Sequence, residues 1–311
     1  MTYTGNGTST KETSLKSTGT APGAPLVSVV LTSYNYEAYV AEAIQSVFTQ
    51  SYRNIELIVV DDGSQDASPD VIRSMIQDAP FPVKTLFKEN GGQSSAFNAA
   101  YEHVHGEIVC FIDSDDVWRE DKVKAMVNLI RRCPDGGVYQ HQCEVGFGGP
   151  NRLEYIISGD VFDGWKRLGP RVNVAVYQGR ISPFVPTVGL AFRKAVLDQV
   201  MPIPKQLITC PDAFLTRTCI THGPLYSRPA VLATWRDHGD NAGKDEQFGY
   251  QAYWLKVIMP ALNEYYRDHD IPLEFYYDPA DQSKPAKAAI PGGLRRLPRR
   301  LLNRLRYTLP R

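Results

Sequence analysis

The stretch EIVCFIDSDDVW, residues 107–118, joins an apolar run to three closely spaced carboxylates. Residues 107–112 suit a buried strand, and Asp113, Asp115 and Asp116 follow where that strand should end. Carboxylates this close raise one another's pKa unless a cation sits among them. The stretch therefore predicts a strand whose carboxyl end carries either a Mg²⁺ or Mn²⁺ site or an acidic cap for the next helix.

The same alternation of strand and helix precedes this stretch. Short β-rich runs lie at residues 26–31, 55–60 and 83–87, and helical periodicity follows at 37–50, around 71–76 and at 94–105, with a further helical pattern at 120–130. Repeated units of this kind build a mainly parallel sheet through right-handed crossovers. We therefore expect an α/β fold with a doubly wound, mainly parallel sheet, and a site outside the carboxyl ends of its strands.

Each of the four expected strands ends in a polar cluster: TSYN (32–35), DDGS (61–64), KENGGQ (88–93) and DSDD (113–116). Asp61 is placed to accept a hydrogen bond from a base or a ribose, but a plain Asx-turn is a strong alternative. The paired glycines at 91–92 suit close approach of a ligand and are equally ordinary in loops. Four clusters at four strand ends favour a shared ligand site.

Composition limits the class of protein. The 311 residues are 43% hydrophobic, enough for a large core, but the apolar runs are far shorter than the ~20 residues that a membrane-spanning helix needs. No signal-peptide pattern opens the chain, so we expect a cytoplasmic protein. The five cysteines form no C-x-x-C pair and are expected to be reduced and buried.

The two ends differ from the middle. Residues 1–24 are rich in Ser, Thr and Gly and are predicted to form a disordered arm. Residues 292–311 carry seven arginines and no acid, with leucines interleaved. That composition, within a basic amphipathic tail at 271–311, suits an anionic membrane surface, although a frayed tail or one docked on an acidic partner is equally compatible with it.

Between the ends we expect a single domain at 25–270, whose regular alternation of strand and helix loosens from about residue 138. A helical pattern spans 249–270, and Pro260 should bend it. Its apolar stripe is expected to be core rather than a ligand site. Aromatic side chains that either contact a ligand or pack in the core occur at Trp165, Tyr177, Phe184 and Trp235.

A series of segments carries a family resemblance: VSVVLTSYN (27–35), LIVVDDGSQD (57–66), NGGQSSAFNAA (90–100), FIDSDD (111–116), PTVGLAFRKAVL (186–197), PDAFL (211–215) and WRDHGDN (235–241). In order and spacing the series resembles the inverting, nucleotide-sugar-dependent glycosyltransferases of family 2, which have the GT-A fold. The resemblance runs from about Pro25 to about Gly243. It implies that the domain at 25–270 has a nucleotide-binding half (25–137) and an acceptor-binding half (138–270).

The resemblance implies roles for individual residues. Asp212 would be the catalytic base, although Pro211 stands where relatives carry a second acid. Asp115 would bind the metal, joined by His238, and Arg236 would neutralise the diphosphate. The nucleotide site would comprise Thr32, Tyr34, Asn35, Asp61, Asn90, Gly92, Asp113 and Ser114.

The implied reaction moves a sugar from a nucleoside-diphosphate donor, expected to be a UDP-sugar, to a hydroxyl of a glycan or lipid-linked acceptor in cell-surface polysaccharide or glycolipid synthesis. Deoxythymidine or guanosine diphosphate carriers stay open. A scaffold that binds nucleotide-sugar without catalysis is the alternative. A sugar nucleotidyltransferase is disfavoured because the loop after the first strand, TSYNY (32–36), is not rich in glycine and Arg/Lys. A dinucleotide-dependent oxidoreductase is disfavoured because no G-x-G-x-x-G follows the first strand. No nucleic-acid partner is expected, and the tail suggests a peripheral position at the inner face of the plasma membrane.

Overall fold

The computed structural model describes residues 23–147, 153–157, 166–168, 184–238, 250–271, 274–276 and 287–289. Residues 1–22 of the predicted arm, Trp165, Tyr177 and the arginine-rich segment 292–311 lie outside the described residues, so the predictions made for them stay predictions.

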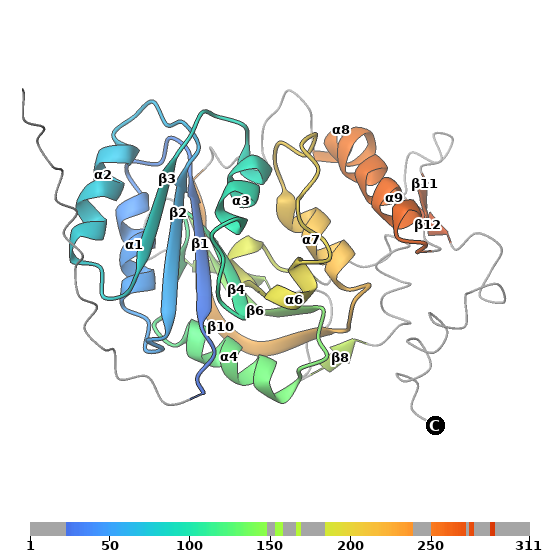
Figure 1. Cartoon of the computed structure of the whole chain (residues 1–311), viewed down its shortest axis with the longest axis horizontal. Helices are drawn as coiled ribbons and strands as arrows, with labels where there is room; N and C mark the ends of the chain where they lie inside the picture. Colours follow the sequence, from blue (N-terminus) through green and yellow to red (C-terminus); the bar gives the residue numbers. More distant parts are fainter. Residues whose placement is uncertain are drawn as a thin grey trace, which may run out of the picture.

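The four strands of the first half run parallel, as predicted. They are β1 (Val27–Ser33), β2 (Ile55–Asp61), β3 (Val83–Phe87) and β4 (Ile108–Asp113), in the spatial order β3-β2-β1-β4. Figure 1 shows these strands side by side, with α1 and α2 on one side of them and α3 on the other. All seven residues of β1 are buried, because helices cover both faces of the sheet.

The helices between these strands match the predicted periodicity. They are α1 (Val40–Phe48), α2 (Ser68–Met75, followed by a 3₁₀ turn at Ile76–Asp78), α3 (Gln93–Tyr101) and α4 (Lys122–Arg132). Each starts two or more residues after a polar strand end, except α3, which begins inside the NGGQ segment. The prediction of a doubly wound α/β fold is confirmed.

The second half extends the same sheet across residue 137. β5 (Val117–Trp118) precedes that residue, and the elements after it are β6 (Val138–Phe147), β7 (Leu153–Ile157), β8 (Lys166–Leu168), a 3₁₀ turn (Thr187–Gly189), β9 (Leu190–Arg193), α6 (Lys194–Leu197), α7 (Pro211–Cys219) and β10 (Leu225–Asp237). The order continues as β4-β9-β6-β10-β5, and β9 runs antiparallel to both β4 and β6. The sheet is therefore mixed, and the four parallel strands of the first half end at the predicted site.

The 13-residue strand β10 was not predicted, since Pro229 interrupts its pattern. A proline cannot donate to a strand ladder, and it is tolerated at a bulge. The register between β10 and β6 shifts between Arg228 and Val231, around that proline. The bulge lets one strand continue past Pro229 to Asp237 at the end of the sheet.

The predicted helix at 249–270 consists of α8 (Tyr250–Tyr253), a π-helical turn (Trp254–Ile258) and α9 (Met259–Asp268). Pro260 is the second residue of α9, so the irregular turn ends just before it. The apolar stripe is core as predicted, because Ile258, Ala261 and Tyr265 are buried.

A short antiparallel pair, β11 (Glu274–Tyr276) and β12 (Lys287–Ala289), follows α9. Cys110, Cys143 and Cys219 are buried, whereas Cys133 and Cys210 are partly exposed, and all five thiols are free. None of the helices in the described part of the chain has both the length and the apolar character needed to cross a bilayer.

Candidate active site

The parallel register brings three predicted residues to one edge of the sheet. Thr32 of β1 pairs with Asp113 of β4, and the next residue of β1, Ser33, pairs with Asp61 of β2. These side chains come from strands far apart in sequence, yet they meet because parallel strands end at the same edge. The predicted clustering of Thr32, Asp61 and Asp113 is what the structure contains.

Asp61 forms the Asx-turn and keeps one carboxylate oxygen without a partner. It is 2% exposed, and its Oδ1 accepts a hydrogen bond from the backbone N–H of Ser64 at 2.9 Å, which is the Asx-turn. Its Oδ2 is buried and has no hydrogen-bond partner among the described residues. A buried carboxylate oxygen without a partner is costly, so Asp61 is suited to accept a donor from a ligand.

Hydrogen bonds connect the loop after β1 to the loop after β2. Asn35 adopts a left-handed φ of 57°, its backbone N–H donates to Ser64 Oγ, and its Oδ1 accepts from the N–H of Gln65 at 2.7 Å. Asparagine tolerates this conformation better than most residues. Tyr34 is 43% exposed beside it. Asn35 therefore fixes the loop that presents Tyr34 to solvent.

Asp62 was missed as a site residue. It is buried, forms a salt bridge with Lys88, and accepts the N–H of Gly91 at 3.2 Å. These contacts shape the loop that contains Asn90 and Gly92. Its place as the second acid of the DDGS segment could have indicated a buried ion pair, since a buried carboxylate needs a partner.

Gly92 lies where only glycine fits. Its φ is +84°, and a Cβ there would lie 2.5 Å from the carbonyl oxygen of Ile208. Close packing against Ile208 brings the loop after β3 to the segment that leads into α7. Residues 88–92 thus connect the predicted nucleotide side of the site with the segment that carries Asp212.

Asp113 accepts a hydrogen bond from Gln93 Nε2 at 2.7 Å, a contact that the sequence did not predict. Burial raises the pKa of Asp113, and the charges of Asp115 and Asp212 raise it further. The effect of Asp212 means that this residue, on α7, lies near the acidic cluster although about a hundred positions separate them in sequence.

Asp115 and His238 are in direct contact. His238 Nε2 lies 3.1 Å from Asp115 Oδ2, and the imidazole stacks on Tyr39 with ring centroids 4.9 Å apart. The Tyr36 hydroxyl also hydrogen-bonds to Asp115, and burial together with that carboxylate raises the pKa of Tyr36. Tyr36 and Tyr39 were not predicted, because aromatic side chains in a loop carry no periodicity.

Arg236 is held by three partners. Its backbone N–H donates to Asp116 Oδ1 at 2.9 Å, its Nε donates to the carbonyl oxygen of Asp115, and its guanidinium pairs with Glu42. Asp116 is fully buried, so its role here is to hold the end of β10. Ser114 is also fully buried, and its backbone N–H donates to Thr32.

Asp212 occupies the second position of α7, directly after Pro211. Burial raises the pKa of Asp212, while the charge of Arg217 opposes that shift. A carboxylate with a raised pKa holds a proton more strongly than an exposed one and is the better general base.

The acids at this edge fit a hard divalent cation by their chemistry. Their oxygens are the ligands that Mg²⁺ and Mn²⁺ prefer. Burial raises the pKa of Asp113, and the charges of Asp115 and Asp212 raise it further; a cation would offset those charges. Within the part of the chain that the structure describes, however, no three His, Cys, Asp or Glu side chains form a ready-made metal site.

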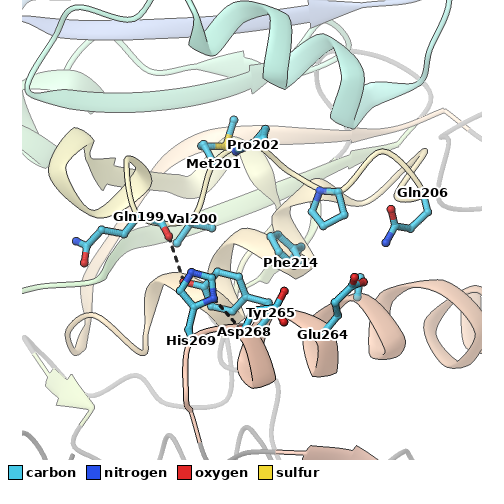
Figure 2. A pocket seen from close by; sticks show the side chains of 12 residues that line it. Gln199, Val200, Met201, Pro202, Gln206, Phe214, Glu264, Tyr265, Asp268 and His269 are labelled. Atoms are coloured by element: carbon cyan, nitrogen blue, oxygen red, sulfur yellow. Dashed lines mark hydrogen bonds between the residues drawn. The ribbon is translucent and has the colours of Figure 1, made fainter. Parts of the chain in front are cut away.

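A separate cavity of about 330 Å³ lies between residues 199–206 and α9 (Figure 2). Phe214, Tyr265 and His269 are among its lining residues, and Tyr265 bonds to the carbonyl of Gln199 at 3.4 Å. None of the acids at the strand ends lines it. The cavity is therefore distinct from the candidate site.

The mixed α/β sheet, with acids at the ends of its parallel strands, has the GT-A fold. Residues 28–201, more than half of the chain, match the family model described as glycosyl transferase family 2, and the chain belongs to that family. The match ends before Asp212, Arg236 and His238.

Among curated relatives, an uncharacterized glycosyltransferase of Nostoc sp. (strain PCC 7120) is 35% identical over 222 residues, which cover 69% of this chain and 66% of the relative. TuaG of Bacillus subtilis, named for teichuronic acid biosynthesis, is 36% identical over 106 residues, covering 34% of this chain and 42% of that protein. The chain thus spans less than two thirds of the length of these relatives.

Two solved structures share the fold. TarS of S. aureus, in complex with UDP-GlcNAc, has a TM-score of 0.54 and 22% identity, with 68% of this chain and 58% of that chain covered. The mannosyltransferase PcManGT of Pyrobaculum calidifontis, in complex with GDP-Man and Mn²⁺, has a TM-score of 0.53 and 20% identity, with 79% and 64% covered.

Proposed function

We propose that this protein is an inverting glycosyltransferase that moves a sugar from a nucleoside-diphosphate donor, of the UDP class, to a hydroxyl of a glycan or lipid-linked acceptor. The observation that carries the proposal is the convergence of Asp61, Asp113 and Asp212 at the carboxyl edge of the parallel strands. Their positions suit one ligand that extends from a nucleoside to a reacting sugar.

The nucleoside end of the donor would lie on β1 and β2. The free Oδ2 of Asp61 would accept a hydrogen bond from the base or ribose, with Thr32 and Tyr34 beside the base. Asp113, held by Gln93, would accept from a ribose hydroxyl. Asn90 and Gly92 would border the nucleotide from the loop after β3, and the backbone at Ser114 would complete the wall.

Asp115 and His238 would hold Mn²⁺ or Mg²⁺ near the diphosphate. When bound, such an ion stabilises the negative charge that develops on the leaving nucleoside diphosphate. The fit is supported by oxygen donors and by the excess negative charge of the cluster. Arg236, positioned beside Asp115, would add positive charge if its guanidinium exchanged Glu42 for a phosphate oxygen.

Asp212 would act as the general base. Its carboxylate would take the proton from the acceptor hydroxyl, whose oxygen forms a bond to the anomeric carbon while the bond from that carbon to the phosphate oxygen breaks. The leaving diphosphate keeps the electron pair, and attack from the opposite face inverts the anomeric centre. No covalent enzyme intermediate is required.

The first test is calorimetric titration with UDP, with and without Mn²⁺, on the wild type and on Asp115→Ala. Metal-dependent binding that disappears in Asp115→Ala supports the site. Absence of UDP binding in every condition rejects the UDP class, and GDP and dTDP should then be titrated in the same way. A chain that binds UDP-sugar but shows no transfer, in the wild type as in Asp212→Asn, would be a scaffold rather than this enzyme.

We further propose a place in cell-surface polysaccharide synthesis, supported by the name of the Bacillus subtilis relative, and contact of residues 292–311 with an anionic membrane at the inner face of the plasma membrane. The seven arginines of this segment supply the charge for that contact. Sedimentation with phosphatidylglycerol vesicles tests it, and equal binding by a chain that lacks residues 292–311 would reject it.

A further inference from the structure

The segment that leads into α7 is held by a side chain from α8. The Tyr253 hydroxyl accepts a hydrogen bond from the backbone N–H of Thr209 at 3.1 Å and donates one to the carbonyl oxygen of the same residue at 3.3 Å. Both polar backbone atoms of Thr209 are thus bound by one hydroxyl group. Because the tyrosine ring has few rotatable bonds, the two contacts fix Thr209 at little entropic cost.

The residue after Thr209 has an unusual conformation. Cys210 adopts a left-handed φ of 55°, although it is not glycine, and no side-chain hydrogen bond caps the helix at this position. Such a backbone is strained for a residue with a side chain and persists only where neighbouring contacts hold it. Asp212 follows two residues later, so the backbone at Thr209 and Cys210 sets where its carboxylate lies.

α9 and the π-helical turn before it contact α7 at its other end. The Tyr266 hydroxyl donates to the carbonyl oxygen of Arg217 at 3.3 Å, and the Arg217 guanidinium lies 4.5 Å from the centre of the Trp254 ring. The hydroxyls of Tyr253 and Tyr266 therefore make comparable hydrogen bonds to the backbone. The first lies before the start of α7 near Asp212, and the second lies in the last turn of α7.

We infer that Tyr253 is a positioning residue for Asp212: it holds the backbone at Thr209 so that the carboxylate faces the acceptor side of the site. This inference rests on the proposed function, in which Asp212 is the general base. A displacement of about 1 Å in a reacting group can lower a rate by about a hundredfold. The hydrogen bonds of Tyr253 thus serve the reaction without touching the substrate.

The test compares Tyr253→Phe with Tyr266→Phe, since each change removes one hydroxyl from a contact with the backbone of α7 or its lead-in. Cys210 reports the local effect because it is a partly exposed free thiol between Thr209 and Asp212. Iodoacetamide labelling, resolved by peptide mass spectrometry with the partly exposed Cys133 as internal reference, should be at least threefold faster at Cys210 in Tyr253→Phe and unchanged in Tyr266→Phe.

Turnover gives the second readout. Release of UDP from UDP-N-acetylglucosamine, UDP-glucose and UDP-galactose is measured with Mn²⁺, with the hydroxyl of water accepting the sugar, and the donor that the wild type uses fastest is kept. We expect kcat to fall about tenfold in Tyr253→Phe, with KM for the donor unchanged, because the donor contacts are intact. Tyr266→Phe should retain the kcat of the wild type.

Unchanged labelling of Cys210 in Tyr253→Phe, or equal changes in both variants, overturns the inference. The variant Asp212→Asn separates this result from failure of the proposed function. If Asp212→Asn keeps wild-type turnover, the proposed base is wrong and the inference falls with it. If Asp212→Asn loses turnover while Tyr253→Phe behaves as the wild type, only the inference is overturned.

Discussion

His238 Nε2 lies 3.1 Å from Asp115 Oδ2, although 123 positions separate the two residues in sequence. Strand β10 makes the contact, since it continues past its bulge to Asp237 and delivers His238 to the end of β4. Tyr39 stacks on the imidazole and limits its rotation. The contact is therefore held from both sides.

Replacing His238 should weaken metal binding. We expect His238→Ala to lower the affinity for Mn²⁺ about tenfold, because the carboxylate of Asp115 loses the group that orients it or shares the ion with it. Calorimetric titration of Mn²⁺ in the presence of UDP measures the change. His222→Ala is the control, since His222 bonds to Tyr265 instead. Equal Mn²⁺ affinity in His238→Ala and the wild type would contradict the prediction.

Replacing Gln93 should weaken nucleotide binding. Gln93→Leu removes the donor that lies 2.7 Å from Asp113 Oδ1 and leaves that carboxylate less satisfied. A hydrogen bond to a charged group contributes about 1.5–3 kcal/mol, so we expect the Kd for UDP to rise tenfold or more. Gln199→Leu is the matched control, because its amide bonds to the Ala195 carbonyl on an exposed helix end. Titration curves for Gln93→Leu that overlay those of the wild type would refute this role.

A methyl group at Gly92 should disturb the loop after β3. Gly92→Ala would place its Cβ 2.5 Å from the carbonyl oxygen of Ile208, and we expect a loss of about 1–3 kcal/mol in the free energy of unfolding together with weaker UDP binding. Gly23→Ala separates the causes, since Gly23 has a similar φ of +79° but nothing within 4 Å of the added atom. Urea unfolding and UDP titration should both distinguish the two variants, and similar results for both would exclude the clash as the cause.

Lys122 should make stability depend on pH. It is fully buried above the Trp118 ring, and burial lowers its pKa to about 8, although the charges of Cys110, Cys143 and Asp116 oppose that shift. The unfolded chain, with a pKa of about 10.4 for lysine, binds this proton more strongly. The charged Lys122 therefore lowers the free energy of unfolding by its full amount below pH 8, and this loss disappears as pH rises toward 10.5.

Comparison with Lys122→Met isolates that contribution from other titrating groups. Between pH 7 and pH 9.5 the wild type should gain on the order of 2 kcal/mol of unfolding free energy relative to Lys122→Met. Urea unfolding of both proteins at the two pH values measures the difference. A constant difference between them would mean that Lys122 keeps an ordinary pKa in the folded protein.

The sequence predicted the part of the site that follows from strand order. Asp61 and Asp113 come directly after apolar runs, and parallel pairing brings such positions together whatever their loops do. Gln93, Tyr36 and Asp62 could not be assigned contacts in this way, because the direction of a side chain in a loop depends on its neighbours. His238 matched a family motif, but its contact with Asp115 depends on β10. That strand was not predicted, because Pro229 interrupts its pattern.

The bulge in β10 also affects the order in which the protein acquires its site. A ribosome makes Asp113 and Asp115 long before Arg236 and His238, and these late residues reach the acids only when β10 has paired with β6 beyond the bulge. Before that pairing, a growing chain carries the acidic loop without its basic partners. The Asp115–His238 contact therefore forms only after residue 238 has been made and β10 has paired with β6.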